Sequence, residues 1–146
     1  MITAENIMTD QIVFVDPEES VERAINLMLR HGVSGLPVVD SSEQLVGVIT
    51  EYDILDIIED FHAQKNKVYQ CMTHNPQTID INTPATALTT IFQKRSIRRY
   101  PVVENGKLVG IISRRELIRL VHDIRIKVLS EMTVDVVSPD AREHIG

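Results

Sequence analysis

The stretch Leu36-Pro37-Val38-Val39-Asp40 recurs 64 residues later as Tyr100-Pro101-Val102-Val103-Glu104, and this repeat decides the fold of the 146-residue chain. Its continuation, Leu45-Val46-Gly47-Val48-Ile49-Thr50, recurs as Leu108-Val109-Gly110-Ile111-Ile112-Ser113 at an offset of 63. One residue is therefore missing from the turn of the second copy, which a surface turn tolerates while the strands keep their register. Each pair of short apolar runs joined by a polar turn predicts a β-hairpin. Such matching over two halves indicates a duplicated unit.

Apolar residues at helical spacing flank both hairpins. In the first half they are Val21, Ala24, Ile25, Met28 and Leu29. The acidic stretch Asp16–Ser20 predicts the start of this helix, and Gly32 predicts a left-handed cap at its end. A second helix from about Glu51 has an expected apolar face of Ile54, Leu55, Ile57, Ile58 and Phe61. The second half predicts the same order: a strand near Gln77–Ile81, a helix over Pro84–Lys94, the hairpin Tyr100–Ser113 and a helix from Arg114 to about Leu129.

The repeated order predicts an α+β fold of two tandem β-α-β-β-α units packed with pseudo-twofold symmetry. Met8-Thr9, which recurs as Met72-Thr73, marks the start of each unit. We expect the first unit to span residues 1–64, the second residues 65–130, and residues 131–146 to form a C-terminal strand or tail. Each unit alone is too small to bury a good core, so the two units pack together. Ligands usually sit in clefts between such halves.

The composition indicates a globular protein with an aliphatic core, because 43% of the residues are hydrophobic and only 4% are aromatic. No apolar run approaches the roughly 18–20 residues that span a bilayer. The first residues lack the basic and apolar stretches of a signal peptide. The single Cys71 has no internal disulfide partner, which is typical of a reducing compartment. We therefore expect a cytoplasmic protein without membrane contact.

Charge is distributed unevenly along the chain, whose net charge is -6. Residues 1–64 contain 13 carboxylates against Arg23 and Arg30, whereas residues 94–127 contain ten basic side chains. Two interpretations fit this asymmetry: a pair of solvated faces, or an anion site in the second half. The arginines that bracket the second hairpin favour the anion site. They are Arg95, Arg98, Arg99, Arg114 and Arg115.

The order Met-Thr, strand, helix, Leu-Pro-Val-Val-Asp, turn and Gly-Val-Ile-Thr-x-x-Asp resembles the cystathionine β-synthase (CBS) domain. The resemblance covers roughly residues 1–130 and occurs twice, so the chain resembles a tandem CBS pair, or Bateman module. It implies a regulatory, ligand-sensing role without catalysis or an obligatory cofactor. Such pairs bind adenosine-containing ligands, commonly AMP, ADP or ATP, in the clefts between their domains, and often stack into disc-like homodimers. If the module signals, the response must pass to a partner protein through its surface or its oligomeric state.

Thr50 and Asp53 have chemistry that suits a nucleotide. Thr50 caps the helix that follows it, and its hydroxyl and the first N–H groups of that helix form an anion seat. Asp53 offers a carboxylate to both ribose hydroxyls. The alternative is that both residues only cap the helix and complement its dipole.

The second copy of this motif differs. Ser113 keeps the hydroxyl, and Arg114 adds a cation where the phosphate is expected. Glu116 replaces the aspartate that is usual in the family, so its ribose contact would be longer and looser.

The resemblance also implies adenine contacts ahead of each hairpin. In the first copy these are Val33, Gly35, Leu36 and Pro37, and in the second they are Ile97, Arg98, Arg99, Tyr100 and Pro101. Gly35 permits close backbone approach, whereas Arg99 at the matching position either obstructs adenine or grips phosphate. A strand-start position that is often threonine in the family is Thr78 in the second half and Phe14 in the first. Phe14 either fills part of a pocket or stacks on a base, so the two sites are unequal.

Other functional classes find less support in the sequence. The five histidines show no metal-ligand spacing, Cys71 has no evident base partner, and phosphate-binding glycine motifs are missing, so an enzyme is not expected. The basic segment raises nucleic-acid binding, but aromatic interleaving and known DNA-binding motifs are missing, and the chain is acidic. A protein-interaction or dimerisation scaffold without bound nucleotide is the remaining alternative.

Overall fold

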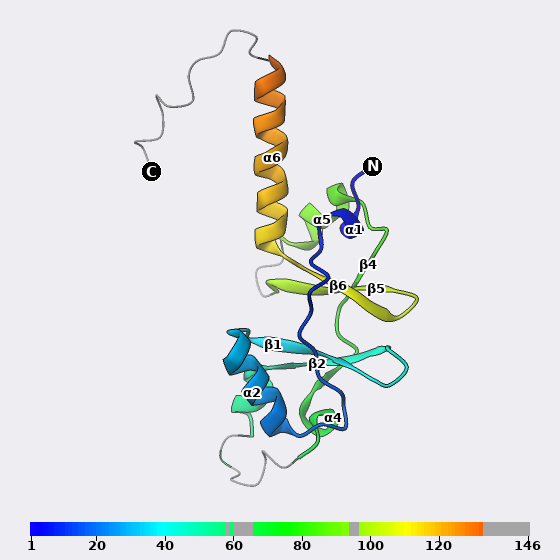
Figure 1. The fold of residues 1–146 in the computed structure, drawn as a ribbon, viewed down its shortest axis with the longest axis vertical. Helices are drawn as coiled ribbons and strands as arrows, with labels where there is room; N and C mark the ends of the chain where they lie inside the picture. Colours follow the sequence, from blue (N-terminus) through cyan, green and yellow to red (C-terminus); the bar gives the residue numbers. More distant parts are fainter. Residues whose placement is uncertain (58, 60–65, 94–96, 133–146) are drawn as a thin grey trace, which may run out of the picture.

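The computed structural model describes residues 1–57, 59, 66–93 and 97–132, which form two small sheets flanked by helices (Figure 1). The first sheet has the order β1-β2-β3, with strands Gly35–Val39, Leu45–Thr50 and Thr73–His74. The second has the order β4-β5-β6, with strands Ile79–Asp80, Arg99–Glu104 and Lys107–Ser113. The helices are α1 (Ala4–Ile7), α2 (Val21–His31), α3 (Glu51–Leu55), α4 (Val68–Cys71), α5 (Ala85–Ile91) and α6 (Arg114–Met132). This arrangement confirms the expected α+β fold of two repeated units.

The two predicted hairpins are present and have matching registers. Leu36 lies opposite Ile49 in β1–β2, and Tyr100 lies opposite Ile112 in β5–β6. Each hairpin supports its own apolar cluster. The first cluster contains Val15, Val21, Ala24, Leu27, Met28, Leu36, Val38, Ile49 and Val68. The second contains Ala4, Ile79, Ile81, Leu88, Phe92, Tyr100, Val102, Ile112 and Leu117.

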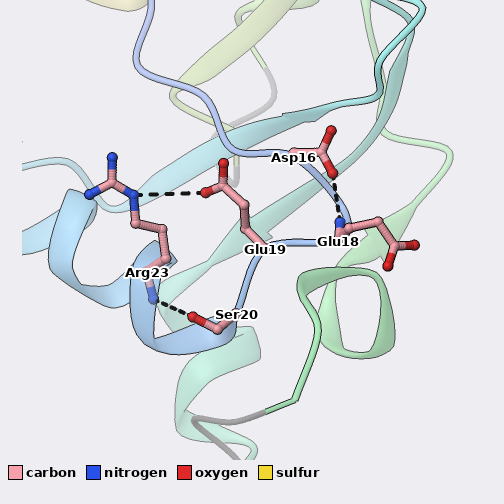
Figure 2. A network of polar contacts seen from close by, with 5 residues as sticks. All are labelled: Asp16, Glu18, Glu19, Ser20 and Arg23. Atoms are coloured by element: carbon pink, nitrogen blue, oxygen red, sulfur yellow. Dashed lines mark hydrogen bonds and ion pairs between the residues drawn. The ribbon is translucent and has the colours of Figure 1, made fainter.

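The acidic stretch before α2 builds the helix start that the sequence predicted (Figure 2). The Asp16 carboxylate accepts a hydrogen bond from the backbone N–H of Glu18 at 2.8 Å, which turns the chain. Ser20 is the N-cap, and its hydroxyl accepts from the backbone N–H of Arg23 at 3.1 Å. Arg23 also lies 3.8 Å from the Glu19 carboxylate, one turn back. Local hydrogen bonding therefore sets where α2 begins.

Several predicted helix details need correction. Gly32 does take the left-handed conformation after α2 (φ 62°), but Leu29 is 77% exposed and does not belong to the buried face. The helix α3 ends at Leu55 and has no fully buried residue, and Ile58 and Phe61 lie outside the described residues. Helix propensity and spacing do not show which side of a short helix the rest of the protein covers, and this decides burial.

The remaining boundaries differ by a few residues. The strand expected near Gln77–Ile81 is the shorter β4, and Pro84 is the N-cap of α5 rather than its first residue. Lys94, the expected end of that helix, lies outside the described residues. The final helix runs to Met132, beyond the expected Leu129, so residues 131 and 132 are helical and do not belong to the expected C-terminal strand or tail. The rest of that predicted tail, residues 133–146, lies outside the described residues.

The segments that carry the two Met-Thr pairs cross between the units. Residues 2–9 pack on the second unit, where Ala4 donates from its backbone to the carbonyl of Thr83 at 2.8 Å. Residues 66–73 pack on the first unit, where Val68 donates to the carbonyl of Glu19 at 2.8 Å. We call these two stretches the crossing segments. The two contacts are related by the offset of 64 residues, so the exchange follows the pseudo-twofold symmetry of the repeat.

Each crossing segment ends against the middle of a hairpin. Thr9 pairs with Ile111 of β6, and Thr73 pairs with Val48 of β2. The turns of the two hairpins also meet, since Leu45 donates to the carbonyl of Gly106 at 3.0 Å. The units are thus joined both by exchanged chain and by their hairpin tips.

The helix α6 extends away from the sheets at one end of the molecule (Figure 1). Only Leu117 of its side chains is buried, and all residues from Val121 to Met132 are exposed. In the part of the chain that the structure describes, no helix is both long enough and apolar enough to cross a membrane.

The crossing segments predict different consequences for two equivalent glycine substitutions. A Cβ at Gly47 would lie 2.8 Å from the backbone oxygen of Thr73 and 2.6 Å from the sulfur of Met72. At Gly110 the nearest atoms all belong to the flexible Met8 side chain. Overpacking against immobile atoms costs about 1–3 kcal/mol. Gly47→Ala should therefore lower the free energy of unfolding by about this amount in urea titrations, and Gly110→Ala by clearly less. Equal losses would show that the backbone of Thr73 adjusts as easily as a methionine side chain.

Candidate ligand cleft between the two units

A cavity of about 150 Å³ lies where the two units meet. Its walls come from three parts of the chain: the stretch after the first crossing segment, the start of the first hairpin, and the end of the second hairpin. The lining residues are Thr9, Gln11, Ile12, Val13, Val33, Gly35, Pro37, Arg99, Ile111, Ser113 and Glu116. Segments far apart in the sequence therefore combine apolar walls with hydroxyl, carboxylate and guanidinium groups.

Six of the residues that the sequence singled out line this cavity. They are Val33, Gly35, Pro37, Arg99, Ser113 and Glu116. Others lie elsewhere: Leu36 and Tyr100 are core residues, and Pro101 is buried. Phe14 is 53% exposed and is not part of the lining, nor are Thr50, Asp53, Thr78, Ile97, Arg98 and Arg114.

The predicted segments nevertheless meet in pairs within each unit. The backbone N–H of Glu51 donates to the carbonyl of Ser34 at 2.9 Å, which joins the end of β2 to the start of β1. Its counterpart is the bond from Arg114 to the carbonyl of Arg98 at 3.1 Å. The guanidinium of Arg114 also donates to the carbonyl of Ile97 at 3.2 Å, so this cation braces the backbone ahead of the second hairpin.

Glu116 folds back onto the end of β6. Its Oε2 accepts hydrogen bonds from the backbone N–H of Ser113 at 2.7 Å and from the Ser113 hydroxyl. This is the reach expected of a glutamate at the third position of a helix. Among the described residues both bonds use the same oxygen, so the other oxygen keeps its capacity to accept hydrogen bonds.

Asp53 is held by more groups than Glu116. Its Oδ2 accepts from the backbone N–H of Thr50 at 2.8 Å and from the Thr50 hydroxyl at 3.1 Å. The hydroxyl of Thr73 donates to both carboxylate oxygens, at 3.2 and 3.4 Å. Thr50 in turn accepts from the backbone N–H of Asp53 at 3.3 Å. The capping interpretation of these two residues therefore describes their contacts in the structure.

Cys71 lies near this carboxylate. Burial raises the pKa of its thiol, and the negative charge of Asp53 raises it further, while a hydrogen bond with Asn66 acts in the opposite direction. A raised pKa keeps the thiol protonated and weakly nucleophilic at neutral pH. In the described residues no group of three or more His, Cys, Asp or Glu side chains is arranged to hold a metal ion.

Sequence reasoning missed five of the lining residues, namely Thr9, Gln11, Ile12, Val13 and Ile111. Four of them belong to one stretch that follows the first Met-Thr pair. The repetition of Met-Thr was visible, but it does not show that the first pair crosses to the second unit. Only this crossing brings Thr9 beside Ser113 and Glu116.

The fold and the cavity define a class of protein: a duplicated α+β domain pair with a cleft between its copies. The sequence profile of the CBS domain matches the chain twice, at residues 4–60 and 68–123. The chain therefore belongs to the CBS domain family.

Related proteins agree with this assignment. The chain is 36% identical over 122 residues to inosine-5'-monophosphate dehydrogenase of Staphylococcus aureus, a match that covers 82% of this chain. It spans only 24% of the length of that enzyme.

Two solved structures of CBS pairs are similar in fold and contain adenosine compounds. CBSX2, a CBS-pair protein from Arabidopsis thaliana, was crystallised in complex with AMP. It is 30% identical, with a TM-score of 0.76 over 86% of this chain and 99% of that one. The CBS domain pair of protein MJ0100, in complex with 5'-methylthioadenosine and S-adenosyl-L-methionine, is 25% identical, with a TM-score of 0.69 over 84% of this chain and 98% of that one.

Proposed function

We propose that this protein is a regulatory module that binds an adenosine-containing ligand, such as AMP, ADP or ATP, in the cleft between its two CBS units. The observation that carries the proposal is the composition of the cavity wall. The wall combines apolar residues of the first unit, including Val33 and Pro37, with Arg99, Ser113 and Glu116 of the second. An apolar pocket with a few polar groups is the usual form of a small-molecule site.

The size of the cavity limits which part of a nucleotide it encloses. Pockets that hold whole drug-sized ligands have volumes of about 300–1,000 Å³, whereas this one has about 150 Å³. A cavity of this size accommodates an aromatic ring. We therefore propose that it encloses the adenine base, with the ribose beside Glu116 and the phosphate extending toward Arg99.

The adenosine ligands of CBSX2 and the MJ0100 domain pair support this choice. The role we propose is regulatory rather than catalytic, in the reducing cytoplasm that the single cysteine favours. A ligand shifts a protein between two arrangements only through different affinities for them. We propose that a partner protein recognises one of these arrangements and so receives the signal.

Replacement of Arg99 should weaken the binding of charged ligands selectively. Hydrogen bonds to charged groups contribute about 1.5–3 kcal/mol, which corresponds to roughly 10–150-fold in affinity. Arg99→Gln should therefore raise the dissociation constant for AMP by about this factor and leave that for adenosine nearly unchanged, as measured by isothermal titration calorimetry. Arg98→Gln is the matched control, since Arg98 is also exposed but does not line the cavity.

Thermal melting with added ligand tests the proposal as a whole. At a hundredfold excess over its dissociation constant, a ligand adds about 2.7 kcal/mol to the stability of the protein that binds it. AMP, ADP, ATP or S-adenosylmethionine should thus raise the melting temperature of the wild type. If none of them binds at millimolar concentration, the sensing proposal fails and a scaffold role becomes the better explanation.

A second candidate function, dimerisation, is favoured by the exposed apolar face of α6. Val121, Ile124 and Val128 continue the line of the buried Leu117 along the helix, at spacings of four, three and four residues, which is typical of helices that pair. Val121, Ile124 and Val128 are each more than 40% exposed. A second copy of the chain offers the same stripe, so a twofold pair of α6 helices would cover both.

Charged substitutions on α6 should show that dimerisation depends on this stripe and not on the opposite face of the helix. Ile124→Glu with Val128→Glu is expected to convert a dimer to a monomer in light scattering coupled to size-exclusion chromatography. Ile126→Glu is the control: Ile126 is also exposed, but it lies about 200° around the helix from Ile124 and Val128. A wild type that elutes as a monomer at all concentrations would rule out this interface.

A further inference from the structure

The two copies of the hydroxyl–acid motif make different contacts although the repeat relates them residue by residue. The offset of the duplication relates Thr50 to Ser113, Asp53 to Glu116, and Thr73 to Thr9. Both threonines end a crossing segment and pair with the centre of a hairpin. A symmetric protein would therefore make the same side-chain contacts in both places.

Only the first copy links the threonine to the acid. The Thr73 hydroxyl donates to both oxygens of Asp53, at 3.2 and 3.4 Å. Together with the two donors of Thr50, this single hydroxyl brings three donors to a carboxylate that has roughly four acceptor positions. In the second copy, the described residues include no side-chain hydrogen bond between Thr9 and Glu116. Both of these residues line the cavity instead.

The difference is confined to the threonine of the crossing segment. Oε2 of Glu116 accepts from the backbone N–H and the hydroxyl of Ser113, in the same way that Oδ2 of Asp53 accepts from the two donors of Thr50. The Thr73 hydroxyl is the additional donor to Asp53. A ligand hydroxyl that approached Asp53 would have to replace the Thr73 hydroxyl and would gain little net free energy from the exchange.

We infer that the two copies of the motif have divided their roles. The Thr73–Asp53 bond is a structural tie that fastens the second crossing segment to the first unit. Thr9, Ser113 and Glu116 form the polar side of the ligand cleft, so each chain binds one adenosine-type ligand. This inference rests on the proposed function for the ligand and on the observed contacts for the tie.

Thermal melting tests the tie without any ligand. Asp53→Ala and Thr73→Val should each lower the melting temperature by about 2–8 °C. In the Asp53→Ala background, Thr73→Val should have almost no further effect, because residues in direct contact are coupled. Thr9→Val should have the same small effect in the wild type and in the Glu116→Ala background. Additive shifts for Thr73 and Asp53 would overturn the tie.

Calorimetric titration with AMP tests the assignment of the cleft. We expect a stoichiometry of one per chain in the wild type, with affinity at least about tenfold weaker in Glu116→Ala. Asp53→Ala and Thr73→Val should bind AMP with an affinity within about threefold of the wild type. A stoichiometry of two, or loss of binding in Asp53→Ala, would overturn the inference. If AMP and related nucleotides fail to bind the wild type, the proposed function fails, while the melting experiment still decides the tie.

Discussion

The exchange of the two crossing segments is the constraint on which the rest of the structure depends. Each unit has a single small sheet and would bury too little apolar surface alone. Ala4 is fully buried in the second core, and Val68 is fully buried in the first. The core of each unit is thus completed by the crossing segment that comes just before the other unit in the sequence. Separation of the units would expose both cores at once, so the pair should fold as one cooperative body.

The same exchange creates the cleft. Because the first crossing segment ends against β6, the chain from Thr9 to Val13 must pass between the two units before it enters the first one. This passage forms one wall of the cavity, and the starts and ends of the hairpins form the others. The cleft is therefore a consequence of how the cores are completed, and a ligand there touches both units. Such a position suits a sensor, because a change in the packing of the units alters the site directly.

Duplication supplied two equivalent motifs, and small substitutions made them unequal. Glu116 has one methylene more than Asp53, and Arg99 is found at the position that corresponds to Gly35. These differences leave the hairpins and the crossing contacts intact, since neither side chain contributes to a core. The roles that we propose, stability for one motif and recognition for the other, are therefore compatible with an unchanged fold.

Much of this architecture is determined by the sequence by itself. The recurrence of Leu36–Asp40 as Tyr100–Glu104 and the polar turns between apolar runs were sufficient to predict both hairpins, the helices that flank them and the α+β class. These features are local, because hydrogen bonding and apolar periodicity over a few residues decide them. Which of the candidate residues face the cleft, and that the stretch from Thr9 to Val13 joins them, was decided only by the tertiary structure. Thr9 and Thr73 are identical residues in identical motifs, yet one lines the cavity and the other is bonded to Asp53. Contacts between segments that are far apart in the sequence decide the surroundings of each threonine, and no local sequence pattern predicts those contacts.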